Sequence, residues 1–189
     1  MRLLGLMLCC FGMSWFSLAN ADSDCDPESA ETKEILKCIS DSYKRVDHKL
    51  NAQYKALVPN HQVKNKKLLL EGQRAWIKFR DSNCSAYRSS SLGGESEIEE
   101  VGCLVSLASS RLVELIYLET GTVGDGFYSL LSVTGGISSK TRDEIVSYVE
   151  NMDRTSDEIE YYKKNCELTG VVYGEEVRNC LTRMKFQNI

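Results

Sequence analysis

Proline is scarce in this chain, with two residues in 189, and histidine is equally rare. So few prolines disfavour a turn-rich β-sandwich and favour helices. The 23 basic and 27 acidic residues give a formal net charge of −4, which argues against a nucleic-acid partner. The composition is that of an ordinary globular protein, with one domain or one domain and an appendage.

Sequence signatures of the common enzyme classes are also missing. The chain has no H-E-x-x-H, no G-x-S-x-G, no S-x-x-K and no C-x-x-C. His48 and His61 stand 13 positions apart with no cluster of metal-ligating residues around them, as is typical of solvated histidines. We therefore expect a non-enzyme with no catalytic residue, no metal site and no cofactor.

The first segment has the three parts of a secretory signal peptide. Residues 1–21 begin with Met1-Arg2, continue with an apolar run to Leu18, and end in Ala19-Asn20-Ala21. The run is too short for a convincing membrane span, and acidic residues follow it closely. A lipoprotein signal has a small residue directly before the modified cysteine. Neither Cys9 nor Cys10 follows such a residue, so we expect a periplasmic or secreted protein without a lipid anchor.

Six cysteines follow that segment, and an even number in an exported chain predicts three disulfides. The two last cysteines lie 14 positions apart, remote from the others, and are expected to pair. In an antiparallel bundle, Cys84 lies level with both Cys38 and Cys103. The sequence leaves this choice open, with a slight preference for Cys84–Cys103 and Cys25–Cys38. The six residues are Cys25, Cys38, Cys84, Cys103, Cys166 and Cys180.

Apolar residues at steps of three and four predict amphipathic helices over residues 29–57, 63–88 and 97–119. Short connections between them predict an antiparallel three-helix bundle. In the second helix the stripe expected to face inward is Leu69, Gln73, Trp76, Ile77, Arg80, Cys84 and Tyr87.

The remainder of the chain differs in composition. Residues 121–136 hold five glycines and are expected to form a linker or ordered loop. Ser138 or Ser139 is a candidate N-cap for a helix that continues toward Cys166, before a turn at 170–174 and a short last helix. The predicted fold is all-α, with a disulfide-stapled three-helix domain over 22–120 and a smaller helical extension over 137–189.

Four carboxylates fall within six positions at the start of the third predicted helix. Compensation of the helix dipole and a solvated helix face account for most clusters of this kind. The alternative is an acidic patch that binds a basic protein partner, because complementary charge speeds encounter and sets orientation. The candidate partner-binding residues are Glu95, Glu97, Glu99 and Glu100.

A polar group in the second predicted helix has two interpretations. Gln73, Trp76 and Arg80 share one helical stripe. Arg80 can therefore lie over the Trp76 ring or pair with a carboxylate of a neighbouring helix. We favour a structural role, in which this group and Asp81 fix how the helices pack.

These motifs resemble the LprI family of small exported helical domains, named after a mycobacterial lysozyme inhibitor. The matching pattern runs over about residues 25–118 and includes Gln-Arg-Ala-Trp-Ile-Lys-Phe-Arg-Asp, followed by a cysteine at position 84. The resemblance implies an inhibitor of lysozyme or another peptidoglycan hydrolase in the cell envelope. The motif residues, interpreted as structural, are Leu50, Asn51, Tyr54, Gln73, Trp76, Arg80, Asp81 and Arg111.

Four functions are thus weighed for this chain. An inhibitor of a lysozyme-like hydrolase comes first. An envelope immunity protein that neutralises a dedicated cell-wall-degrading toxin comes second. A structural envelope protein and an enzyme acting on peptidoglycan follow, and the absence of a catalytic motif places the enzyme last.

Overall fold

The computed structural model describes residues 25–60, 63, 65–90, 93–124, 126, 127, 129, 131, 132 and 141–187. The described chain is all-helical, as the sequence predicts. The helices are α1 (Thr32–Leu57), α2 (Lys66–Ser90), α3 (Gly94–Thr120), α5 (Arg142–Glu150), α6 (Ser156–Tyr173) and α7 (Val177–Phe186). The predicted signal peptide, His61, Ser138 and Ser139 lie outside the described residues.

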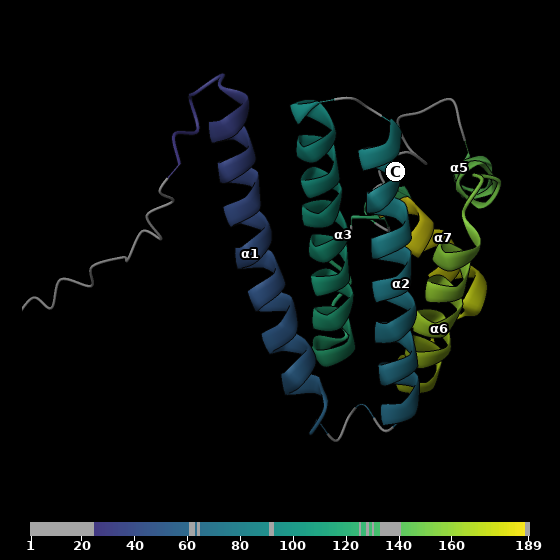
Figure 1. Ribbon diagram of the computed structural model, residues 1–189. Helices are drawn as coiled ribbons and strands as arrows, with labels where there is room; N and C mark the ends of the chain where they lie inside the picture. The colour runs from purple at the N-terminus through teal and green to yellow at the C-terminus, as the bar shows by residue number, and fades with distance from the viewer. Residues whose placement is uncertain are drawn as a thin grey trace, which may run out of the picture.

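The first three helices form the predicted antiparallel bundle, in which α3 lies between α1 and α2 (Figure 1). The C-terminal helices continue this row: α6 packs along α2, α7 packs on α6, and α5 packs on α7. The C-terminal segment therefore shares the core of the bundle. The division into separate domains stays a prediction.

Because α2 packs on both α3 and α6, it has more buried surface than the single predicted stripe. Phe79 is 2% exposed and stacks on Tyr161 of α6, with ring centroids 6.0 Å apart. Ile77 and Tyr87 were expected to face inward, but they are 39% and 41% exposed. The prediction is wrong for these two residues, and it also missed the second buried face of α2, which carries Phe79 and lies against α6.

The single helix predicted from about 138 to 166 is also wrong, since the structure divides it into α5 and α6. Thr141 is the N-cap of α5 and forms a capping box with Glu144. Thr155 is the N-cap of α6, where its side chain accepts a hydrogen bond from the Glu158 amide. That helix continues through most of the expected turn and ends at Tyr173, with Gly174 as its C-cap, whose φ of 69° suits glycine.

Three disulfides staple the described structure, and they are the pairings that the sequence favours. They join Cys25 to Cys38, Cys84 to Cys103, and Cys166 to Cys180. Each contributes on the order of 2–4 kcal/mol by restricting the unfolded chain. Disulfides of this kind are typical of proteins outside the reducing cytoplasm.

By length and composition α3 meets the criteria for a membrane span, with a mean hydropathy of 1.6 over its most apolar window. Its position explains this composition, because α3 is flanked by α1 and α2. Leu107, Ala108, Leu115 and Leu118 of its C-terminal half are all buried. The core helix of a soluble protein passes the same test, so the hydropathy of α3 is weak support for a membrane span.

Candidate functional site

Three of the four predicted partner-binding glutamates are exposed at the start of α3. Glu95 and Glu97 lie in the first turn, while Glu99 lies in the second. The N-cap residue Gly93 offers no side chain to the first amide groups of the helix. The carboxylates of the first turn therefore compensate the positive end of the helix dipole while remaining on the surface.

Glu100 differs from the other three because it has a partner within the fold. Its Oε2 accepts a hydrogen bond from Nε of Arg88 at 2.7 Å, which links the end of α2 to the start of α3. The side chain of Glu100 is 15% exposed, whereas that of Arg88 is 70% exposed. The structure thus gives Glu100 a role in joining two helices.

A pocket of about 560 Å³ opens between α2 and α3, beside the exposed glutamates. Residues at helical spacing contribute one wall from each of these helices. The C-terminal segment closes the pocket on a third side. The lining residues are Phe79, Asn83 and Tyr87 of α2; Glu99, Gly102, Cys103, Ser106 and Leu107 of α3; and Arg154, Glu158 and Gln187.

The charges on the C-terminal side of the pocket are paired with each other. Nε of Arg154 lies 3.2 Å from Oε1 of Glu158, and its Nη2 donates to the carbonyl of Lys185 at 3.0 Å. The hydroxyl of Tyr162 donates to the same Glu158 oxygen at 2.5 Å. Burial, together with the Glu158 carboxylate, raises the pKa of Tyr162, so the phenol keeps its proton. Glu99 is the third charged residue among the described residues of the lining.

Gly102, which lines this pocket, is an unusual residue for the interior of a helix. It lies in the interior of α3, where glycine costs about 0.5–1 kcal/mol relative to alanine. A Cβ built at Gly94 would lie 2.7 Å from the Thr32 side chain, but at Gly102 no described atom lies within 4 Å. No close contact with the described residues requires a glycine here, and its missing side chain enlarges the pocket.

The family-motif residues divide into buried and surface groups. Leu50, Trp76, Gln73 and Arg111 are buried, and Tyr54 packs partly buried against the same core. These residues hold α1, α2 and α3 together.

Arg80 follows the first of its two predicted arrangements. Its Cζ lies 5.0 Å from the centre of the Trp76 ring. It also pairs with Asp81, its neighbour on α2, at 2.7 Å, in place of a carboxylate from another helix. Asn51 is exposed and donates to Asp47 at 2.8 Å.

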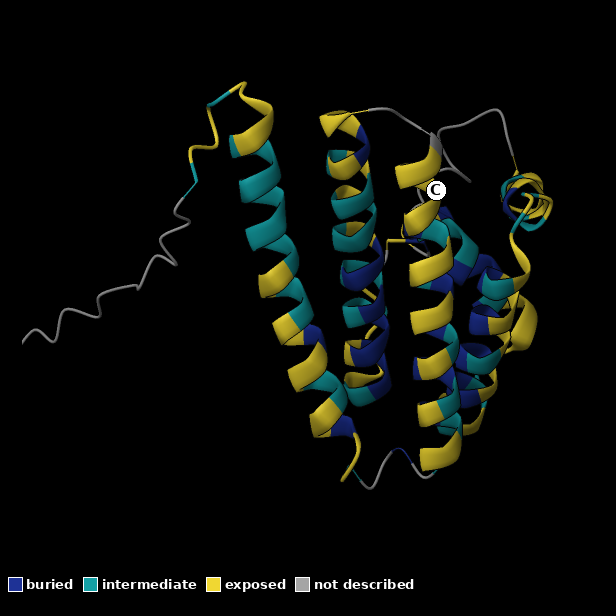
Figure 2. Cartoon of the chain, viewed as in Figure 1, coloured by how far each residue is buried: buried dark blue, intermediate teal, exposed yellow. Residues whose placement is uncertain are grey.

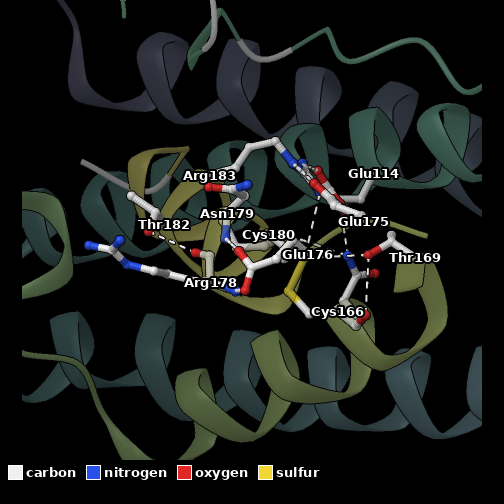
Figure 3. The surroundings of a disulfide bond; sticks show 12 residues. Glu114, Cys166, Thr169, Glu175, Glu176, Arg178, Asn179, Cys180, Thr182 and Arg183 are labelled. Atoms are coloured by element: carbon white, nitrogen blue, oxygen red, sulfur yellow. Dashed lines mark hydrogen bonds and ion pairs between the residues drawn. A yellow bond between two sulfur atoms is a disulfide. The ribbon is translucent and has the colours of Figure 1, made fainter. Parts of the chain in front are cut away.

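A buried polar cluster around the Cys166–Cys180 disulfide was not predicted (Figure 3). Arg111 donates from Nε to Gln73 at 3.0 Å and from Nη1 to Asn165 at 2.8 Å. The amide of Asn165 in turn donates to Oε2 of Glu114 at 2.7 Å. This chain of hydrogen bonds connects α2, α3 and α6 inside the protein.

Arg183 of α7 completes the cluster, and Figure 3 shows its side chain directed at Glu114. Its guanidinium pairs with both oxygens of Glu114, with Nη2 to Oε2 at 3.1 Å, and with Glu175 at 3.0 Å. Burial by itself would lower the pKa of Arg183, but the charges and hydrogen bonds of Glu114 and Glu175 together outweigh burial and raise that pKa. Arg111-x-x-Glu114 was visible in the sequence, but nothing there indicated Arg183 as its partner.

No group of three or more histidine, cysteine, aspartate or glutamate residues able to hold a metal is found among the described residues. His48 is exposed on α1.

In comparisons with known proteins, the first half of the chain matches a protein family. Residues 25–115 match the family model described as lysozyme inhibitor LprI. The chain is also 29% identical over 126 residues to an uncharacterized protein of Rhizobium meliloti (strain 1021), covering 59% of this chain and 88% of that relative. No solved structure matches the chain significantly. Residues 25–115, just under half of the chain, therefore form a segment of the LprI lysozyme-inhibitor family.

Proposed function

We propose that this protein is an exported, non-enzymatic inhibitor of a lysozyme or a related peptidoglycan hydrolase. The family match over residues 25–115 carries this proposal, since the family is named for lysozyme inhibition. The three disulfides and the predicted signal peptide support a periplasmic or secreted location. A disulfide-stapled fold also suits a protein that must resist unfolding outside the cell.

The surface proposed to contact the hydrolase is the exposed N-terminal half of α3. Glu95, Glu97 and Glu99 lie there beside the 560 Å³ pocket. Lysozymes are commonly basic, so an acidic surface would attract them and help to orient them. At physiological ionic strength the screening length is about 8 Å, so this local cluster matters more than the net charge of −4.

The direct test is lysis of a cell-wall suspension by a c-type lysozyme, with and without the purified, oxidised protein. We expect dose-dependent protection at about micromolar concentration or below, since affinities in this range are common for protein complexes. Protein with reduced and alkylated cysteines is the matched control and should protect less. Lysis at the uninhibited rate, with oxidised protein shown to be folded, would contradict c-type lysozyme as the target. A dedicated cell-wall-degrading toxin would then become the favoured partner.

A further inference from the structure

The exposed charged residues of α1 are all basic. The helix carries six basic and three acidic residues, in a chain whose net charge is −4. Its acidic residues are partly buried, and two of them have partners on the same helix: Asp41 pairs with Lys44 at 2.8 Å, and Asp47 accepts a hydrogen bond from Asn51. The exposed charged residues are Lys33, Lys44, Arg45, Lys49 and Lys55.

Four of these cations share one side of the C-terminal half of α1. This basic face consists of Lys44, Arg45, Lys49 and Lys55. At 3.6 residues per turn they fall within an arc of about 140°. The other exposed residues in this arc are His48, Ala52 and Ala56. No acidic residue of this half of the helix lies in the arc, so the face presents positive charge alone.

The basic face is turned away from the protein core. Leu50 and Leu57 are both 0% exposed, and they lie on the opposite side of α1. That side packs on α3, and α1 forms the edge of the row of helices (Figure 1). The basic face is therefore open to a partner over its whole length.

We propose that the basic face binds the surface of a membrane that contains anionic phospholipids. Lipid phosphates form a plane of negative charge, and each lysine or arginine near such a plane adds to the attraction. The inference goes beyond the proposed function and shares with it only the exported location.

The shape of the basic face favours a flat partner. Its cations extend over about 17 Å of helix, and the two alanines among them leave the long side chains free to reach a plane. The exposed residues in the arc include no aromatic ring that could stack on a sugar or a base. Attraction between charges, without recognition of a single ligand, is what a lipid surface requires.

The acidic start of α3 is too distant to cancel this attraction. A Cβ built at Gly94 would lie 2.7 Å from the Thr32 side chain, so α1 and α3 begin at the same level. Lys49 and Lys55 follow Thr32 by about five and six helical turns, which corresponds to roughly 25–35 Å. This separation exceeds the screening length of about 8 Å at physiological ionic strength. A membrane bound through the basic face leaves the acidic start of α3 outside the contact.

Sedimentation with lipid vesicles tests the proposal. The purified, oxidised protein is mixed with vesicles of phosphatidylcholine alone, or with vesicles that also contain about 30 mol% phosphatidylglycerol. We expect binding only to the anionic vesicles, with a partition coefficient at least about fivefold lower in 500 mM than in 50 mM salt. Because no hydrolase is present, a negative result overturns this proposal without bearing on lysozyme inhibition.

A pair of charge-matched variants assigns the binding to α1. The triple variant Arg45→Gln, Lys49→Gln and Lys55→Gln should lower the partition coefficient at least about tenfold. Its control removes the same charge from exposed positions of α2, α5 and α6 and should stay within about twofold of the unchanged protein. The control variant is Arg74→Gln, Arg142→Gln and Lys163→Gln.

Circular dichroism should show the same helical content for both variants, since all the substituted residues are exposed and glutamine is a good helix former. Equal losses of vesicle binding in the two folded variants would overturn the proposal. Binding to isolated peptidoglycan without binding to anionic vesicles would refute the membrane and assign the basic face to an anionic polymer.

Discussion

The two halves of α3 place charged residues in opposite surroundings. In residues 94–106, Glu95, Glu97 and Glu99 face solvent beside an open pocket. In residues 107–120, Arg111 and Glu114 are 0% exposed. Figure 2 shows buried residues becoming more frequent along α3 toward its C-terminal end. Most of the carboxylates in the first half are exposed to solvent, whereas the charged groups of the second half are buried within the fold.

The difference comes from the neighbours of each half. The C-terminal half contacts Asn165 and Arg183 of the C-terminal helices through hydrogen bonds and an ion pair. Removing these groups from water is costly, and their mutual pairing compensates only if it is complete. The N-terminal half is covered less, so its glutamates stay hydrated and contribute little to stability.

The largest expected effect is the removal of Glu114. Glu114→Ala leaves the buried Arg183 without its ion-pair partner on α3. We therefore expect the free energy of unfolding in urea to fall by about 3–5 kcal/mol. Glu97→Ala in the exposed half is the matched control, expected within about 0.5 kcal/mol of the unchanged protein. Similar losses of unfolding free energy for the two variants would contradict the distinction between the two halves of α3.

Loss of the disulfide beside the buried cluster should have the next largest effect. Cys166 and Cys180 are 14 positions apart, and replacing both by alanine should lower the free energy of unfolding by about 3 kcal/mol. The measurement is urea unfolding under non-reducing conditions. A change below about 1 kcal/mol would mean that the surrounding hydrogen bonds hold α6 and α7 together without the disulfide.

Exchanges between glycine and alanine should differ in size between the two halves, because one site is open and the other is buried. Gly102→Ala should raise the free energy of unfolding by about 0.5–1 kcal/mol, because a Cβ there meets no described atom within 4 Å. Ala108→Gly should lower it by at least about 1 kcal/mol, because Ala108 is fully buried and loses both propensity and contacts. Destabilisation by Gly102→Ala would show that another part of the chain packs on this glycine.

The smallest expected effect concerns the exposed ion pair between Glu150 and Arg178. This pair is the reference for the buried pair between Glu114 and Arg183. The hydrogen bond from Arg178 lowers the pKa of Glu150 below its ordinary value of 4.5. The resulting stabilisation is present above pH 4.5 and is lost as the pH falls through the lowered folded-state pKa.

Glu150→Gln removes this titration. Between pH 7 and pH 3 the variant should lose less unfolding free energy than the unchanged protein, by under about 0.5 kcal/mol, because the pair is solvent-screened. The check is urea unfolding at both pH values. A larger loss in the variant would give the wrong sign and refute the assignment.

Local patterns in the sequence were sufficient for much of this fold. The periodicity of α1, α2 and α3 is a property of each segment alone, and the cysteine spacing restricts which residues can pair. Arg80 over Trp76 follows from their i, i+4 spacing on one helix.

Features that depend on distant residues were missed. Phe79 is buried because α6 packs on it, and Arg183 meets Glu114 across 69 positions of sequence. The pocket beside Glu99 needs residues from two helices and the C-terminal segment, so no single motif indicates it. The break between α5 and α6 has a local signal, the N-cap Thr155, which the apolar spacing on both sides of it obscured.

The most direct test of the central claim is the inhibition constant of the triple variant Glu95→Lys, Glu97→Lys and Glu99→Lys for a c-type lysozyme. It is measured at two salt concentrations, alongside the thermal unfolding midpoint of the variant. We predict at least a tenfold weaker inhibition, a smaller dependence on salt, and a modestly lower unfolding midpoint, because lysines in the first turn oppose the helix dipole. An unchanged inhibition constant in a folded variant would contradict the role assigned to the exposed half of α3.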